Sequence, residues 1–206
     1  MMGPDLAGEL GEILTRARKG DDAALGHLLE QYRPYLTLLA RLQIGRHIQG
    51  KADCSDVVQE TFLEASRHFV RFRGETEAEF TAWLRQILAT CLSHLVRRYL
   101  GTQARDVRLE RTLENDLDQS SRAINQSFVA IQSTPSQRAS HREQVVLLSN
   151  ALHELSEDYR EVIVLRHLEG LTFPQIAERM GKSVDSVEKL WIRGLTRLRR
   201  TFGEGS

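Results

Sequence analysis

Two short helical runs, separated by a glycine turn, lie near the C-terminus and limit what this chain can fold into. Apolar residues recur at helical spacing over residues 157–169, and Gly170 ends that run. A second run begins at Thr172, where Gln175 three residues later has the form of a capping box. Gly181 then permits the positive φ that a sharp turn between helices requires. The pattern predicts two helices joined by a tight turn to a third.

The third helix combines an apolar face with a basic face. Ser183 is its predicted N-cap. Its apolar positions recur at steps of three and four: Val184, Val187, Trp191, Leu195 and Leu198. The opposite stripe is mainly basic: Lys182, Ser186, Lys189, Arg193, Arg197 and Arg200. A basic helix behind a tight helical turn is the arrangement that inserts a helix into the DNA major groove.

Charge supports a DNA partner for this helix, although a solvated helix face is the bland alternative. Residues 182–200 contain six Lys or Arg against two acidic residues, a net charge of plus four, whereas the whole chain balances 28 against 28. The basic charge is therefore concentrated on one element. The helix pair that precedes this stripe favours DNA binding over the solvated face.

Composition favours an almost all-α protein with two helical domains. The 206 residues are 41% apolar and 27% charged, with only four prolines and few alternating β-branched runs. No stretch approaches the roughly 18 consecutive apolar residues of a membrane helix, and residues 1–20 lack the apolar core of a signal peptide. Two isolated cysteines suit a reducing compartment. We expect a cytoplasmic protein with no membrane segment.

The first hundred residues form a second organised block. Helical spacing occupies about residues 6–20, 21–49, 54–69 and 77–99, and Pro34 is expected to kink or split the second run. An Arg-Phe-Arg-Gly-Glu loop at 71–75 precedes the last run. Residues 101–140 are rich in Ser, Gln and Asp with weak periodicity, and we interpret them as a flexible linker in which a transient helix can form.

Together these residues resemble a bacterial sigma factor of the extracytoplasmic-function (ECF) group of the sigma-70 family. Residues 53–62 (DCSDVVQETF) are similar to region 2.2, and Phe80–Leu84 with the Arg97-Arg98 pair is similar to regions 2.3 and 2.4. Residues 159–200 are similar to region 4. The resemblance implies a region 2-like domain over 1–100, a linker over 101–140 and a region 4-like helix-turn-helix domain over 141–202.

The resemblance implies two partners, core RNA polymerase and promoter DNA. Polymerase would be bound through its β′ clamp helices and β flap, with these residues on the clamp-binding helix: Asp53, Asp56, Gln59 and Glu60. The −10 element would be contacted by Arg71, Arg73, Trp83, Thr90, His94, Arg97 and Arg98. The −35 element would be contacted by Lys182, Ser183, Asp185, Ser186, Lys189 and Arg193.

Aromatic and cationic side chains in the first block suggest how a melted strand would be held. Arg85 joins the two loop arginines as a candidate phosphate ligand, and Phe72 or Trp83 offers a surface for base stacking. For Trp83 a place in the core is the commoner outcome at this helical spacing. Many members of the family carry Asn and Asp where this chain has Thr90, Cys91 and His94, so the preferred −10 base is open.

Other functions have less support in the sequence. A repressor or activator that binds a two-fold-symmetric site alone is the main alternative. The sequence contains no P-loop, G-x-G-x-x-G, H-E-x-x-H or G-x-S-x-G motif, so no catalytic residue is predicted. Cys91 and His94 lie three residues apart without further ligands, so no metal or cofactor is predicted. Members of the family are often held by an anti-sigma protein, and no motif here identifies one.

Overall fold

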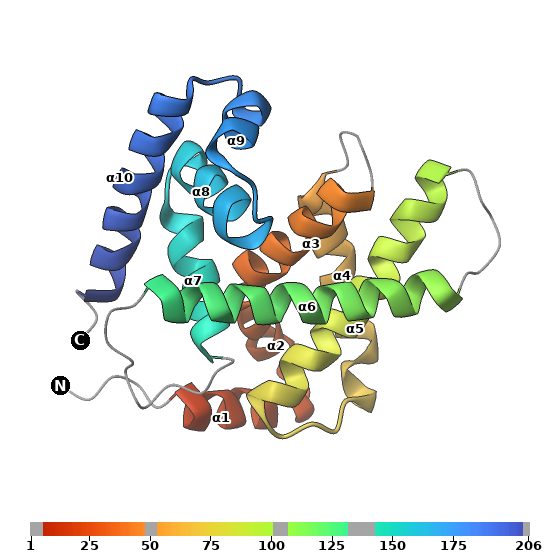
Figure 1. Cartoon of the computed structure of the whole chain (residues 1–206). Coiled ribbons are helices and arrows are strands. Elements are labelled where there is room, and N and C mark those ends of the chain that lie inside the picture. The colour runs from red at the N-terminus through yellow and green to blue at the C-terminus, as the bar shows by residue number, and fades with distance from the viewer. Residues whose placement is uncertain (1–5, 48–52, 101–106, 132–142, 204–206) are drawn as a thin grey trace. The chain divides into compact units, whose positions relative to one another are not determined.

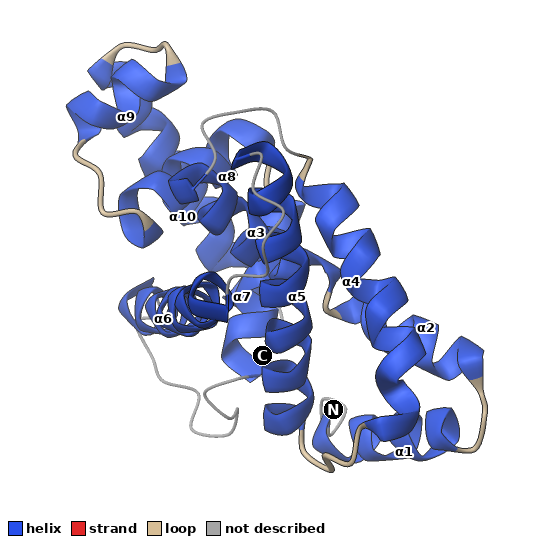
Figure 2. Ribbon diagram, turned by 90° about the vertical axis from the view of Figure 1, so that its right-hand side faces the viewer, coloured by secondary structure: helices blue, strands red, loops and turns tan. Residues whose placement is uncertain are grey.

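The computed structural model describes residues 6–47, 53–100, 107–131 and 143–203 (Figure 1). Within these residues the chain forms helices and no strand, which confirms the all-α expectation (Figure 2). It divides into two compact units, Met1–Asp118 and Gln119–Ser206.

Unit 1 is built from five helices and the first half of a sixth. The bounds are α1 Leu6–Arg18, α2 Asp22–Gln31, α3 Arg33–His47, α4 Cys54–His68, a 3-10 turn Phe69–Arg71, and α5 Glu77–Leu100. Helix α4 packs against α3 and α5, and α1 packs against α2. The fully buried core includes Tyr35, Leu36, Leu39, Phe80, Leu84, Leu88 and Leu92. Burial of these large side chains is the main driving force for this unit.

Proline splits the second helical run as predicted. Helix α2 ends at Gln31 and α3 begins at Arg33, with Tyr32 between them. Pro34 therefore occupies the first turn of α3, where its missing N–H removes no helical hydrogen bond.

The predicted linker contains a long helix, α6 (Val107–Ile131). Among the positions of α6 whose burial is described, Leu113, Leu117, Ser120 and Ile124 are buried; they are spaced by four, three and four, so they form one face. The serine within this face interrupts the apolar pattern, and that is why the sequence periodicity looks weak. The expectation of only a transient helix is corrected for residues 107–131, which form 25 consecutive helical residues.

Unit 2 contains the second half of α6 and four further α-helices. These are α7 Glu143–Glu154, α8 Glu157–Ile163 continued by a π-helical turn Val164–Leu168, α9 Phe173–Met180 and α10 Val184–Gly203. Helix α10 packs on α8 and on α9. Gly170 and Gly181 adopt φ values of 72° and 62°, the left-handed conformation predicted for the second of them.

Candidate functional site

The helix-turn-helix of unit 2 is set by local capping and turn chemistry. The Gln175 carboxamide oxygen accepts hydrogen bonds from the backbone N–H of Thr172 at 2.9 Å and from its hydroxyl at 2.8 Å. After Gly181, the Lys182 N–H donates to the carbonyl of Ala177 at 2.9 Å, which closes the turn. The Ser186 N–H then donates to Ser183 Oγ at 3.3 Å, so the predicted N-cap of α10 is confirmed.

A tryptophan anchors α10 to the rest of this unit. Trp191 Nε1–H donates to His167 Nε2 at 3.1 Å, and the two rings stack with centroids 6.1 Å apart. Its indole also meets Phe173 edge to face at 5.5 Å. Burial, and secondarily the neighbouring Arg166 charge, lower the pKa of His167, which favours the neutral imidazole that this hydrogen bond requires. The orientation of α10 is thus tied to α9 and to the π-helical turn.

Packing of α10 departs from the predicted apolar face at one end. Val187 and Leu198 are fully buried, and Trp191 and Leu195 are half-buried. Val184 is 39% exposed, so its assignment to the buried face is wrong. It is the first residue of α10, directly after the turn. Gly194, absent from the prediction, is buried instead, and a Cβ there would lie 3.1 Å from Ile163 Cδ1.

The six residues assigned to the −35 element are all exposed and lie together at the N-terminal half of α10 and its turn. Two of their cations are paired within the protein. Lys182 Nζ lies 3.3 Å from an Asp158 carboxylate oxygen, and Lys189 Nζ lies 2.7 Å from one of Asp185. Arg193 forms no ion pair with any residue that the structure describes. This surface therefore offers both bound and free cations to a phosphate backbone.

The loop between α4 and α5 presents its two arginines but not its phenylalanine. Arg71 and Arg73 are exposed, whereas Phe72 is only 7% exposed. The Phe72 ring stacks on Trp83 with centroids 4.8 Å apart and also contacts Phe80. The interpretation of Phe72 as a stacking surface is wrong because the ring is needed in the core. Trp83 is half-buried, with Phe72 over one face of its ring.

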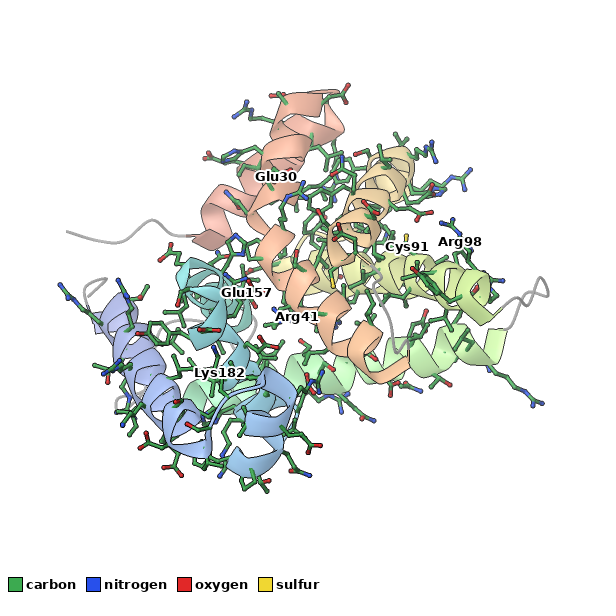
Figure 3. All side chains as sticks on the ribbon, turned by 90° about the horizontal axis from the view of Figure 1, so that it is seen from above. Glu30, Arg41, Cys91, Arg98, Glu157 and Lys182 are labelled. Atoms are coloured by element: carbon green, nitrogen blue, oxygen red, sulfur yellow. The ribbon has the colours of Figure 1, made fainter. Side chains whose placement is uncertain are left out.

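Other residues assigned to the −10 element lie along α5. Thr90 is half-buried and donates its hydroxyl to the Gln86 carbonyl at 3.2 Å, while His94 is exposed. Arg98 is also exposed (Figure 3). Arg97 is 15% exposed, donates to the Ser93 carbonyl at 3.2 Å and lies 4.0 Å from the Glu110 carboxylate of α6. The exposed members of this set therefore stand apart from the largely covered Arg97.

Arg85 does not present its guanidinium to solvent, contrary to its interpretation as a phosphate ligand. Its side chain is 12% exposed, and Nε donates to Asp118 of α6 at 2.8 Å. A second contact reaches the hydroxyl of Tyr35 at 3.3 Å. The carboxylate of α6 takes the place that a phosphate would occupy.

Cys91 is buried against α4, and burial raises the pKa of its thiol to about 11. His94 is exposed. The two side chains therefore lie in different environments. Within the described parts of the chain, no group of three His, Cys, Asp or Glu side chains is arranged to hold a metal ion.

Helix α4 carries an acidic and apolar outer face. The Asp53 carboxylate caps the helix by accepting the Ser55 N–H at 2.8 Å. Exposed side chains follow at helical spacing, namely Asp56, Gln59, Glu60 and Leu63, and the last is 53% exposed. The opposite side, with Val58 and Phe62, is buried. The four residues assigned to polymerase binding thus belong to one exposed stretch of this helix.

Glu79, which is absent from the predicted site residues, organises the loop before α5 with its carboxylate. Its Oε2 accepts from the N–H groups of Glu75 and Thr76, each at 3.0 Å, and from the Thr76 hydroxyl at 2.8 Å. The sequence does contain a signal for this role, because Thr76-Glu77-Ala78-Glu79 has the form of a capping box before a helix.

No described helix is both long and apolar enough to cross a membrane.

Comparisons with known proteins agree with this architecture. Residues 28–105 match the family described as Sigma-70 region 2, and residues 146–198 match Sigma-70, region 4. The ECF RNA polymerase sigma-E factor of Haemophilus influenzae is 30% identical over 175 residues, which cover 85% of each chain. The Escherichia coli sigma-E factor is 29% identical over 177 residues, covering 85% of this chain and 84% of that one.

A solved structure, CnrH in complex with the cytosolic domain of CnrY, is 25% identical, with a TM-score of 0.36 and coverage of 95% of this chain and 98% of that chain. The two family matches occur in the order of the two helical units, and the similarity to the sigma-E factors extends over most of both chains. The chain therefore belongs to the ECF group of the sigma-70 family of RNA polymerase sigma factors.

Proposed function

We propose that this chain binds core RNA polymerase and directs it to promoters through two DNA-contacting surfaces. In this proposal, residues 1–100 bind polymerase and the −10 element, residues 141–202 bind the −35 element, and residues 101–140 connect them. The observation that carries it is the coexistence of the exposed acidic face of α4 with the exposed cationic face of α10. A chain that only binds DNA has no need of the first surface.

The polymerase surface is the exposed face of α4. Carboxylates and an amide around the apolar Leu63 suit a basic partner helix with an apolar contact at its centre. This is the chemistry expected of a site for the β′ clamp helices, and charge complementarity there accelerates association.

The −35 surface is the N-terminal half of α10, held by the turn at Gly181 and by Trp191. Its lysines and arginine can contact phosphates or guanine edges, and its serines can contact either. The −10 surface comprises the exposed loop arginines together with His94 and Arg98 on α5. We propose that the chain performs this work in the cytoplasm with its polymerase and has no catalytic activity of its own.

A reconstitution experiment tests the proposal. The purified chain and core polymerase from its own organism should together give run-off transcripts from promoter-containing DNA, and neither should do so alone. Glu60→Lys should weaken binding to core polymerase, because it reverses a charge at the centre of the α4 face, and should leave binding of a −35 duplex unchanged. Glu12→Lys, at an exposed acidic position on α1, is the matched control.

If the chain gives no promoter-dependent transcript with its own core polymerase but binds a two-fold-symmetric duplex tightly by itself, it is a conventional helix-turn-helix regulator. If Glu60→Lys and Glu12→Lys weaken polymerase binding equally, the α4 face is not the docking surface.

A further inference from the structure

The loop that joins α4 to α5 is held by contacts from α5 and from α1. Glu79 of α5 accepts three hydrogen bonds from Glu75 and Thr76 through a single carboxylate oxygen. These hydrogen bonds, the largest contribution coming from the Thr76 hydroxyl, lower the pKa of the Glu79 carboxyl because they stabilise its ionised form. The C-terminal end of the loop is therefore fixed to the first turn of α5.

The centre of the loop leaves no room for any side chain but that of glycine. A Cβ built on Gly74 would overlap the buried Phe72 ring and would lie 2.8 Å from Glu79 Cβ. The Phe72 ring is itself pinned against Trp83 and Phe80. Because the backbone passes so close to a fixed aromatic ring, the loop has one tightly packed path in this region.

A cation of α1 contacts the same glycine. The guanidinium of Arg18, in the last turn of α1, donates a hydrogen bond to the carbonyl oxygen of Gly74. Arg18 lies before residue 28, where the match to Sigma-70 region 2 begins. A contact across 56 positions of sequence thus brings the N-terminal helix to the loop.

The orientation of α1 is itself well defined. Gly20 turns the chain with φ of 90°, and Arg16 pairs with Asp21 at 2.7 Å. Asp21 also caps α2 by accepting the Ala24 N–H at 2.9 Å. These contacts fix the turn between α1 and α2, directly after Arg18. They favour an orientation of α1 in which the Arg18 guanidinium stays at the loop.

Two exposed arginines are presented by this braced loop. Arg71 lies at its start, and Arg73 folds back so that its guanidinium donates to the Val70 carbonyl at 2.6 Å. A surface that holds its cations in place before binding loses less conformational entropy when it captures a flexible single strand. Contacts to backbone phosphates by such cations are what position a strand for base recognition.

We propose that Arg18 and Glu79 are positioning residues for the −10 element, which hold the 71–76 loop in the shape that presents Arg71 and Arg73 to the melted strand. The inference rests on the proposed function and extends it to α1, outside the region 2 match. Loss of the Arg18 hydrogen bond should lower affinity for the single-stranded DNA about fivefold, the effect of one net hydrogen bond of about 1 kcal/mol.

The test compares Arg18→Ala, Arg18→Lys and Glu79→Gln with Lys19→Ala, which removes an exposed neighbouring cation at the same end of α1. Each full-length variant is assembled with core polymerase. The probe is a fork-junction DNA whose single-stranded segment has been selected by the wild-type holoenzyme from a random pool. Affinities for core polymerase and for duplex DNA without the single-stranded segment are measured in parallel.

Arg18→Ala and Glu79→Gln should weaken binding to the fork several-fold and broaden the base preference recovered from the pool. Their affinities for core polymerase and duplex DNA should equal those of the wild type. Arg18→Lys should restore part of the fork affinity, and Lys19→Ala should retain all of it.

Two results overturn the inference. The first is that Arg18→Ala binds the fork as well as Lys19→Ala does. The second is that its affinities for the fork, for core polymerase and for duplex DNA fall together, which would indicate only a structural role for Arg18. Failure of the proposed function looks different, because the wild-type holoenzyme would then select no single-stranded segment from the pool.

Discussion

Removing single cations from α10 tests the proposed −35 surface and ranks its members. The variants are Lys189→Gln and Arg193→Gln, assembled into holoenzyme and titrated against a labelled −35 duplex by fluorescence anisotropy. Each phosphate contact contributes about 0.9 to the slope of log affinity against log salt, so one contact accounts for about 3.5-fold of the affinity lost between roughly 50 and 200 mM salt. Both variants should therefore show a flatter salt dependence than the wild type.

The structure further predicts that the two variants are unequal. Lys189 lies 2.7 Å from Asp185, and the two side chains are 62% and 72% exposed. An exposed pair four residues apart on a helix is worth about 0.3–0.5 kcal/mol, or about twofold in affinity. Lys189 gives up this pair to contact DNA, whereas Arg193 has no such partner among the described residues. Arg193→Gln should cost about twofold more than Lys189→Gln.

Asp185→Asn completes a double-mutant cycle. It should raise duplex affinity about twofold by releasing Lys189 from its pair, and it should have a smaller effect in a Lys189→Gln background. Lys19→Gln, at an exposed cation directly after α1, controls for the change in net charge. If the salt slopes of Lys189→Gln and Arg193→Gln match that of the control, these residues do not contact the phosphate backbone and this part of the −35 surface is misassigned.

Three further predictions concern stability. Because the pKa of His167 is lowered on folding, the unfolded state binds the proton more readily than the folded state does. The stability of the fold should therefore be retained above pH about 6.5 and lost as the pH falls below it. Thermal melts should show a smaller loss for His167→Gln. Gly194→Val should destabilise by about 1–3 kcal/mol in urea denaturation, since its Cβ would lie 3.1 Å from the nearest side-chain atom. Asp118→Asn should cost about 1 kcal/mol by the same assay, because it weakens the partner of the largely buried Arg85.

The helix-turn-helix could be predicted because its determinants are local. The capping pair of Thr172 and Gln175 and the positive φ of Gly181 act within a few residues of sequence. The split at Pro34 has the same character, since the ring restricts the backbone wherever it occurs. Such features depend little on the remainder of the chain.

The predictions that failed depend on what a residue meets in three dimensions. Phe72 lies between two arginines, a context equally suited to a stacking platform and to a core anchor, and only the approach of Trp83 and Phe80 decides between them. Helix α6 was predicted only as a transient helix within a linker, and Ser120 occupies a position on its buried face. Hydrophobic periodicity detects a buried position only when its side chain is apolar.

The number of Lys and Arg residues in a segment does not by itself define a DNA-binding surface, because exposure and pairing differ from one cation to the next. Lys182 and Lys189 form ion pairs whose side chains are one-third to nearly three-quarters exposed, and pairs in water are readily exchanged for phosphate. The Arg85 side chain, in contrast, is only 12% exposed in its pair with Asp118. To bind a phosphate, Arg85 would first have to leave Asp118, and its largely buried charge would then lack a partner. In a chain of zero formal net charge, attraction to DNA depends on local cations that are both exposed and free to exchange. By that criterion the exposed cations of α10 are available to a phosphate backbone, whereas Arg85 is committed to its pair with Asp118 of α6.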